Sequence, residues 1–260
     1  MSRRPDPLPR FYRWRSNLIQ FPLFCIVTTL CGSLALFVSL FEKSGRIQHR
    51  IAQFWARLCV LISFARLTVR GAENLRKCPV AVYAGNHTSY MDTPVIFASL
   101  PFQFRILAKQ DLWKMPFIGW YLNRSGQIPV DSDTTRGGHV SLSAGVRALK
   151  AGMPLFVFPE GSRTPDGALK EFMAGAAYLA LRAQVPLIPV ALNGVFDLMP
   201  MHTHHVYPKG GLVLSVGEPI DTTGMTIRQI PEVNERLRVA IEDLLAQAEG
   251  RPAESQQARA

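Results

Sequence analysis

The feature that most constrains this chain is an uncharged stretch of 26 residues near its N-terminus, residues 16–41. A helix needs about 20 predominantly apolar residues to cross the hydrocarbon core of a bilayer, so this stretch is long enough. A secretory signal peptide has an apolar region of only about 7–15 residues, followed by a small-residue cleavage site. The stretch in this chain is longer than that, and no small-residue cleavage site follows it. We therefore predict a membrane segment that is retained in the protein.

A second stretch, residues 51–69, has apolar residues at helical spacing but also contains Arg57 and Arg66. An amphipathic helix at the membrane interface can keep such arginine heads in water. Three arrangements are open: a hairpin that enters one leaflet, a first segment that spans while the second lies flat, or a second segment packed on a soluble domain. Basic residues flank the first segment on both sides, so the positive-inside rule does not assign its orientation.

The overall charge allows three kinds of partner. The chain has 29 Lys and Arg against 19 Asp and Glu, a net charge of +10. Such an excess suits nucleic acid, an anionic membrane or an anionic substrate. A nucleic-acid binder would be expected to show a Lys/Arg-rich element interleaved with aromatic residues, whereas the longest uncharged run of this chain comes early and favours a membrane. The hydrophobic share of 48% excludes a disordered chain.

The cysteines do not predict a metal site or a disulfide framework. Cys25, Cys31, Cys59 and Cys78 form no C-x-x-C pair, and three of them lie in apolar stretches near the N-terminus. We predict that they are small buried hydrophobic residues in a protein of a reducing compartment.

From residue 71 onward, short apolar runs alternate with amphipathic ones, which predicts a layered α/β domain. Predicted strands cover residues 79–84, 104–108, 154–158, 185–192 and 211–216. Predicted helices cover residues 93–100, 112–122, 139–150, 171–183 and 231–248. The chain thus divides into membrane-anchoring helices (1–68), a catalytic α/β domain (69–250) and a tail expected to fray (251–260).

A histidine and an aspartate follow the first of these predicted strands. His87 comes two residues after Gly85, and Asp92 lies five residues further along. Imidazole can accept a proton from an alcohol near neutral pH, and a carboxylate on its other nitrogen orients it. No Ser or Cys stands in a strained G-x-S-x-G setting, so this pair would activate an external hydroxyl. The alternative is that the His–Asp pair only stabilises the loop.

A glycine and an arginine follow the predicted strand at 154–158. Gly161 would expose backbone N–H groups, and Arg163 offers a planar fork that suits phosphate. This pattern predicts an anion site, and a tight turn with a solvated arginine is the alternative.

Two other clusters allow a functional and a plain interpretation. Four aromatic residues could line an acyl channel or touch the interface, but their spacing also suits a core-facing helix stripe, which we expect: Trp113, Phe117, Trp120 and Tyr121. Three histidines could bind a metal, but only Asp197 is a nearby partner, so we expect a solvated loop: His202, His204 and His205.

Residues 86–92 (NHTSYMD) and 158–164 (FPEGSRT) together resemble motifs I and III of the glycerolipid acyltransferases. The resemblance is closest to the 1-acyl-glycerol-3-phosphate acyltransferase (lysophosphatidic acid acyltransferase) family. Residues 108–112, 126–131, 185–190 and 216–220 resemble other stretches of that family. The resemblance covers about residues 69–220.

The resemblance implies an α/β fold with a mixed sheet flanked by helices, preceded by the membrane-embedded segment or hairpin. It implies that His87 deprotonates the free hydroxyl of a lysophospholipid, that Asp92 orients His87, and that the acyl group comes directly from acyl-CoA or acyl-carrier protein. No cofactor and no metal are expected. Pro189 is expected to have an acyl-binding or structural role. The implied substrate-binding residues are Asn86, Ser89, Lys109, Glu160, Gly161, Ser162, Arg163 and Thr164.

Membrane lipids are the implied partners, and the catalytic domain is expected on the cytoplasmic face of the inner (cytoplasmic) membrane, where acyl thioesters occur. The expected product is phosphatidic acid, made for phospholipid biosynthesis. Alternative functions are the same chemistry on another lysophospholipid, a lyso-aminolipid or glycerol 3-phosphate, a non-catalytic lipid-binding protein, and a hydrolase.

The chain departs from the family pattern in two places. Ser132 follows Asp131 where many members have arginine, and whether Arg136 replaces that arginine is open. Residues 172–175 (FMAG) lack the lysine that many members carry before the glycine.

Overall fold

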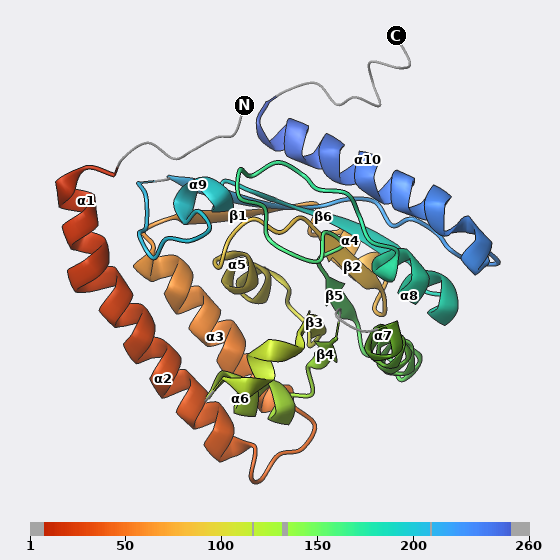
Figure 1. Ribbon diagram of the computed structural model, residues 1–260, viewed down its shortest axis with the longest axis horizontal. Helices are drawn as coiled ribbons and strands as arrows, with labels where there is room; N and C mark the ends of the chain where they lie inside the picture. Colours follow the sequence, from red (N-terminus) through yellow and green to blue (C-terminus); the bar gives the residue numbers. More distant parts are fainter. Residues whose placement is uncertain (1–7, 116, 132–134, 209, 251–260) are drawn as a thin grey trace.

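The computed structural model describes residues 8–115, 117–131, 135–208 and 210–250 (Figure 1). Within these residues one mixed sheet has the strand order β1-β7-β6-β2-β5-β3-β4. Only the β6–β7 pair is antiparallel among the pairings described. The strands are β1 (Arg66–Arg70), β2 (Val82–Gly85), β3 (Arg105–Lys109), β4 (Ile128–Val130), β5 (Leu155–Val157), β6 (Leu187–Asn193) and β7 (Gly211–Val216). The predicted α/β fold with a mixed sheet is confirmed.

Helices cover both faces of the sheet (Figure 1). One face packs against α3 (Arg46–Ile62) and α5 (Asp92–Ser99), and the other against α7 (Thr135–Lys150), α8 (Gly175–Ala183) and α10 (Ile230–Ala248). Successive residues of a strand point to opposite faces. Tyr83 and Phe156 therefore enter the core beside α5, whereas Val82 and Leu155 enter the core beside α8. Short helices are α4 (Asn74–Lys77), α6 (Ile118–Arg124), α9 (Val195–Leu198), and 3₁₀ turns at Gln110–Lys114 and Ile227–Gln229.

A continuous apolar helix of 29 residues, Arg10–Val38, precedes this domain. It comprises α1 (Arg10–Arg15), a π-helical turn (Ser16–Gln20) and α2 (Phe21–Val38). In the described part of the chain it is the one helix that is long and apolar enough to cross a membrane. It packs against α3 and contacts α6, so it lies along the domain (Figure 1).

Hydrogen bonds near the start and in the middle of this helix connect it to the domain. Near its start, the Ser16 hydroxyl accepts from the backbone N–H of Val206 at 3.0 Å, and the Gln20 amide donates to the Ile62 carbonyl at 2.9 Å. In the middle of α2, the Thr28 hydroxyl accepts the indole N–H of Trp55 from α3 at 3.0 Å. Ser16 and Gln20 are fully buried, so these polar groups need the partners that the domain supplies.

The predicted helical stretch 51–69 is not one helix. Helix α3 ends at Ile62, Phe64 has a positive φ of 57°, and the following residues form β1. The predicted helix 112–122 is also divided, into the 3₁₀ turn and α6. The expectation that its aromatic residues face the core is wrong for Phe117 and Trp120, whose side chains are about half exposed. Strands β1 and β4 lie at the two edges of the sheet and were not predicted.

Candidate active site

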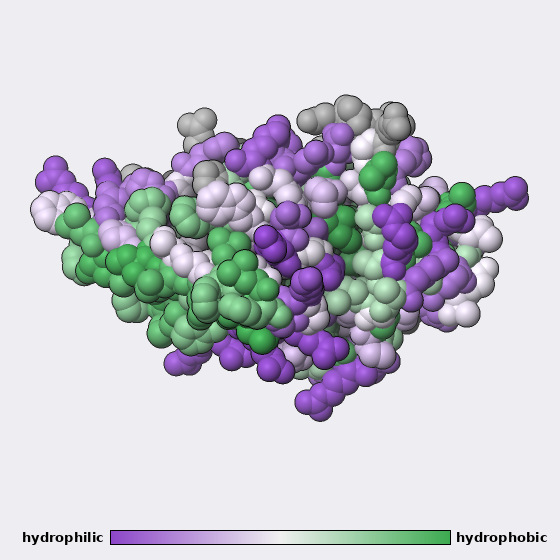
Figure 2. Space-filling model, turned by 90° about the horizontal axis from the view of Figure 1, so that it is seen from below, coloured by the Kyte–Doolittle hydropathy of each residue, from purple (hydrophilic) through white to green (hydrophobic). Residues whose placement is uncertain are grey.

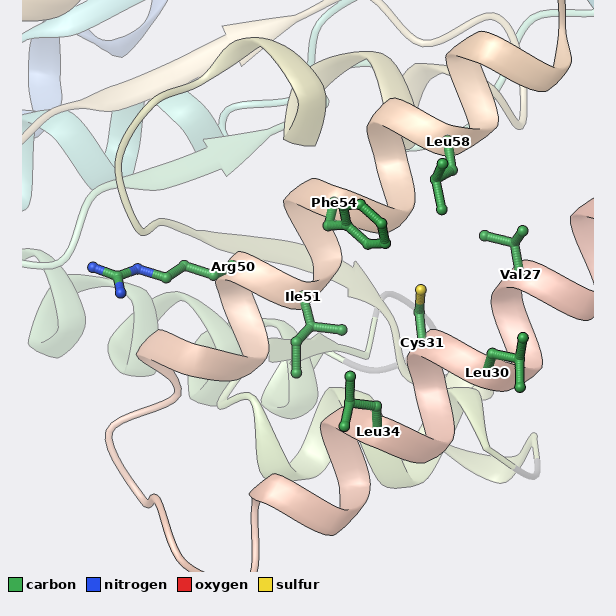
Figure 3. A pocket seen from close by; sticks show the side chains of 8 residues that line it. All are labelled: Val27, Leu30, Cys31, Leu34, Arg50, Ile51, Phe54 and Leu58. Atoms are coloured by element: carbon green, nitrogen blue, oxygen red, sulfur yellow. The ribbon is translucent and has the colours of Figure 1, made fainter.

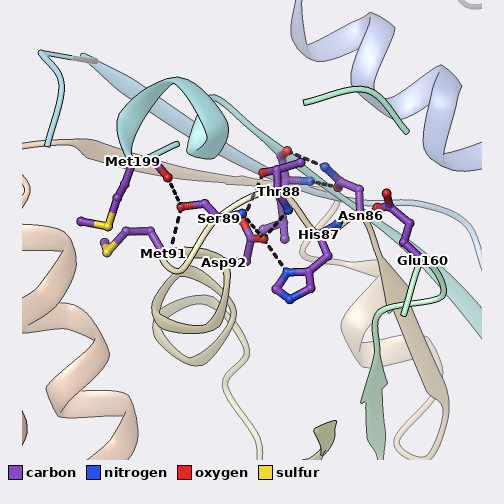
Figure 4. Close-up of polar contacts among 9 residues, drawn as sticks. Asn86, His87, Thr88, Ser89, Met91, Asp92, Glu160 and Met199 are labelled. Atoms are coloured by element: carbon purple, nitrogen blue, oxygen red, sulfur yellow. Dashed lines mark hydrogen bonds and ion pairs between the residues drawn. The ribbon is translucent and has the colours of Figure 1, made fainter. Parts of the chain in front are cut away.

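The candidate active site is the loop between β2 and α5, residues 86–91 (Figure 4). Strand β2 lies between β5 and β6 and is parallel to both, so the loops after β2 and β5 emerge at the same edge of the sheet. At the end of β2, a Cβ atom on Gly85 would lie 2.9 Å from the ring of Phe156. A glycine is therefore needed where the catalytic loop leaves the sheet.

His87 and Asp92 form a hydrogen-bonded pair across this loop. Nδ1 of His87 lies 2.8 Å from Oδ2 of Asp92, and the Asp92 side chain is fully buried. The same oxygen accepts the backbone N–H groups of Thr88 at 2.6 Å and Ser89 at 2.8 Å. Oδ2 accepts both of these N–H groups, so we treat Asp92 as an ionised carboxylate. The hydrogen atom between Asp92 and His87 is therefore assigned to Nδ1 of the imidazole. Nε2 of His87 then carries the lone pair of a base.

The ring of His87 has one face covered and one edge open. Phe158 stacks on it with a centroid distance of 3.8 Å and an angle of 16° between the ring planes. Nε2 has no hydrogen-bond partner among the described residues, and 20% of the histidine side chain is exposed. The arrangement holds the imidazole plane in place and leaves its basic nitrogen accessible to a substrate hydroxyl.

Glu160 connects the loop after β5 to the catalytic loop. One carboxylate oxygen accepts the backbone N–H of His87 at 2.7 Å, and the other accepts the backbone N–H of Lys170 at 3.0 Å. Burial raises the pKa of this carboxyl to about 7, although the two hydrogen bonds act in the opposite direction. Glu160 therefore faces backbone donors, and its role in this geometry is to position His87.

The side chains of Asn86 and Ser89 hold this loop through hydrogen bonds to neighbouring backbone. The Asn86 amide donates to the carbonyl of Leu192 at 3.0 Å and accepts its N–H at 2.7 Å. The Ser89 hydroxyl donates to the carbonyl of Met199 at 2.7 Å (Figure 4). Both side chains are buried. The structure thus points these two predicted substrate-binding residues toward neighbouring backbone.

The loop after β5 has a tight turn at Gly161, whose φ of +67° favours glycine. Its N–H donates to the Phe158 carbonyl at 3.1 Å, so this donor is used inside the turn. Thr164 is buried, and its N–H donates to the carbonyl of His87 at 3.1 Å. Ser162 is exposed and accepts the Lys170 ammonium at 2.6 Å.

Arg163 projects from the same loop toward the catalytic loop. Its Cζ lies 3.6 Å from the ring centroid of Tyr90. Its Nη1 atom is buried and has no hydrogen-bond partner among the described residues. A buried guanidinium nitrogen without a partner is suited to an anionic ligand.

The other two predicted residues are Lys109 and Pro189. Lys109 ends β3 at the same edge of the sheet, is 61% exposed and pairs with Asp111 at 3.0 Å. Pro189 lies inside β6 opposite Ala84, and its carbonyl accepts the N–H of Gly217 at 2.9 Å. Ser132 and the side chain of Arg136 lie outside the described part of the chain.

The histidine cluster lies on the loop after α9, as predicted. His204 bonds to Asn17 through Nε2 at 2.8 Å, and His202 is exposed. Within the described residues no group of three His, Cys, Asp or Glu side chains could hold a metal ion.

Sequence reasoning missed three residues of the site: Phe158, Tyr90 and Lys170. Phe158 and Tyr90 stand inside the two motifs, each two positions before an acidic residue, and this repeated spacing was a usable signal. Lys170 lies eight residues beyond Ser162, and only the fold brings the two together.

Comparison with known proteins agrees with this geometry. Residues 66–193 match the family model described as Acyltransferase. The chloroplast 1-acyl-sn-glycerol-3-phosphate acyltransferase LPAT1 of Arabidopsis thaliana is 30% identical over 79% of this chain and 60% of that protein. The 1-acyl-sn-glycerol-3-phosphate acyltransferase of Saccharomyces cerevisiae is 28% identical over 86% of this chain and 75% of that protein. The chain spans about 60% of the length of the plant relatives that it matches.

A solved structure shares the fold. It is the crystal structure of the 1-acyl-sn-glycerophosphate (LPA) acyltransferase, PlsC, from Thermotoga maritima, with a TM-score of 0.78 and 24% identity. The match covers 92% of this chain and 98% of the other chain. It therefore includes most of the N-terminal helices as well as the α/β domain.

Proposed function

We propose that this chain is an acyltransferase that transfers a fatty acyl group to the free hydroxyl of 1-acyl-glycerol 3-phosphate, because residues 66–193 match the Acyltransferase family model and its relatives carry that activity in their names. The product is phosphatidic acid, an intermediate of phospholipid biosynthesis. The donor is an acyl thioester, either acyl-CoA or acyl-carrier protein, and the reaction uses no cofactor and no metal. The observation that carries the proposal is the His87–Asp92 pair with its accessible Nε2, together with the buried Nη1 of Arg163, which has no hydrogen-bond partner among the described residues.

The reaction follows from the positions of these groups. Nε2 of His87 takes the proton of the acceptor hydroxyl as its oxygen attacks the thioester carbonyl. The attack forms the C–O bond of the new ester, and Asp92 stabilises the imidazolium that forms on His87. The C–S bond of the thioester then breaks. The thiolate leaves and takes the proton from His87. Arg163 holds the acceptor phosphate during these steps.

The surface of the protein supports membrane association. Figure 2 shows hydrophobic side chains gathered at one end of the molecule, where α2 and α6 lie in Figure 1. Exposed residues there include Leu30, Leu34 and Phe37 of α2 and Trp120 of α6. An apolar groove of about 400 Å³ between α2 and α3 adds to this surface (Figure 3). Such an exposed patch is typical of a membrane-binding surface.

The packing favours a hairpin in one leaflet over a full span. Helix α2 lies along the domain and is connected to it by hydrogen bonds of Gln20, just before its first residue, and of Thr28, in its middle. A helix that crossed the bilayer would have to leave the domain along its length. In this proposal the apolar face of α2 enters one leaflet, and the active site faces the cytoplasm, where acyl thioesters occur.

The test is a mass-spectrometric transfer assay on detergent-purified protein with acyl-CoA or acyl-carrier protein and a panel of lysolipids. His87→Ala should lose about 10²–10⁴ in rate. His139→Ala, which removes an exposed histidine of α7, is the matched control and should keep wild-type turnover. Wild-type rates in both variants would contradict the proposal. If another lysolipid is preferred, that lysolipid is the acceptor and the proposed chemistry stands. Cleavage of the thioester without any acceptor would indicate a hydrolase.

A further inference from the structure

The contact between Tyr90 and Arg163 joins the two loops of the site. Tyr90 lies in the catalytic loop between His87 and Asp92, and its side chain is 57% exposed. The guanidinium carbon of Arg163 lies over its ring at 3.6 Å from the centroid. At this distance the cation is attracted to the negative face of the ring.

The guanidinium of Arg163 has few polar contacts in the described part of the chain. Within the described residues, Arg163 makes no hydrogen bond and no ion pair, and its buried Nη1 has no partner. An arginine side chain has many rotamers, and fixing it when a ligand binds opposes binding. The ring of Tyr90 is therefore the contact that can hold Arg163 in one orientation before the acceptor arrives.

Hydrogen bonds hold the two residues that flank Tyr90. Ser89, the preceding residue, is fully buried and donates to the Met199 carbonyl at 2.7 Å. Its hydroxyl also accepts the N–H of Met91 at 3.1 Å. Both chain neighbours of Tyr90 are thus fixed, although the tyrosine ring itself projects to the surface.

We propose that Tyr90 is a positioning residue, which holds the Arg163 guanidinium ready for the phosphate of the acceptor and so sets the affinity for phosphate-bearing acceptors. The inference rests on the proposed function for the identity of the acceptor. The ring does not touch the reacting atoms in this scheme, so its loss should affect acceptor binding more than the chemical step.

The experiment uses the full chain in detergent micelles and compares Tyr90→Leu with Tyr90→Phe. The phenylalanine variant keeps the aromatic face and removes only the hydroxyl. Tyr90→Leu should raise the KM for 1-acyl-glycerol 3-phosphate about tenfold with kcat within about twofold of wild type. Tyr90→Phe should restore the wild-type KM. An unchanged KM in the leucine variant, or a fall in kcat alone, would overturn the proposal.

A double-mutant cycle tests whether the effect acts through Arg163. On an Arg163→Ala background, Tyr90→Leu should change the KM by less than about twofold, because the partner is already absent. Fully additive effects would show that the ring acts elsewhere and would overturn the proposal.

A binding measurement separates this inference from the proposed reaction. On the inactive His87→Ala background, calorimetry with 1-acyl-glycerol 3-phosphate should give an about tenfold higher Kd when Tyr90 is replaced by leucine. If wild type transfers no acyl group but binding still depends on Tyr90, the proposed reaction fails and the positioning role stands. If transfer is observed and the Kd does not change, the positioning role fails and the reaction stands.

Discussion

The carboxylate of Glu160 holds the backbone nitrogen of His87 at 2.7 Å, although 73 residues separate the two in the chain. The same residue holds Lys170 through its second oxygen. Because β2 and β5 are parallel neighbours, the loops that follow them meet, and one buried side chain can join them. The backbone of His87 is thus held by a carboxyl group whose pKa is raised by burial to about 7.

The buried carboxyl predicts a pH dependence of stability. Burial raises the pKa of Glu160 to about 7, above the 4.5 of a free glutamate, so the folded state keeps a proton that the unfolded state releases. The free energy of unfolding should therefore fall as pH rises from about 4.5 to about 7. In Glu160→Gln this contribution should be absent. Denaturant midpoints of the two proteins across this range check the prediction, and parallel curves would contradict it.

Asp92→Asn should lower kcat by about 10²–10⁴, because it removes the negative charge that stabilises the imidazolium of His87. Asp221→Asn is the matched control, since Asp221 is an exposed carboxylate that also accepts a nearby backbone N–H, from Thr223 at 2.9 Å. Steady-state kinetics of both variants decide the matter. Equal activities would remove Asp92 from the mechanism.

Asn86→Ala separates a structural role from a substrate-binding role. The variant leaves the backbone N–H and carbonyl of Leu192 without their side-chain partner, which should cost about 2–4 kcal/mol of stability. Asn193→Ala, which removes a single 3.4 Å contact with Glu249, should cost under about 0.5 kcal/mol. Thermal unfolding and KM are measured together. A raised KM with unchanged stability would favour substrate binding instead.

His49 predicts acid sensitivity on the opposite side of the domain from α10. Its Nε2 lies 3.0 Å from the carbonyl of Phe102, so it donates there as a neutral imidazole. Burial lowers its pKa to about 4 from 6.5, and stability should be lost as pH falls between these values, because the unfolded chain takes up the proton. His49→Gln should flatten this part of the profile. The check is chemical denaturation between pH 4 and 6.5, and an unchanged slope would exclude His49 as the cause.

The apolar face of α2 predicts membrane affinity. Replacing Leu30 and Leu34, which are 64% and 52% exposed, by glutamine should weaken binding to phospholipid vesicles by at least about tenfold, since each buried leucine contributes about 1.5–3 kcal/mol. Ile227→Gln, at an exposed isoleucine away from this helix, is the control. Vesicle co-sedimentation measures both. Equal partitioning would place the membrane contact elsewhere.

Local patterns in the sequence were sufficient for several features of this protein. The uncharged stretch at residues 16–41 predicted the apolar helix, because length and lack of charge are properties of a segment alone. The alternation of apolar and amphipathic runs predicted the α/β layers. Asp92 lies only five residues from His87, so their pairing could be anticipated from the chain itself, and the structure places them 2.8 Å apart.

Tertiary structure alone decided which of the motif side chains bond to backbone groups. Asn86 and Glu160 lie in the same motifs as His87 and Arg163, but β6 brings the backbone of Leu192 against Asn86, and the loop after β2 brings the N–H of His87 against Glu160. The edge strand β1 has a polar sequence, and its pairing with β7 joins residues more than a hundred positions apart. A sequence pattern carries short-range periodicity, whereas such long-range pairings depend on how the whole sheet assembles.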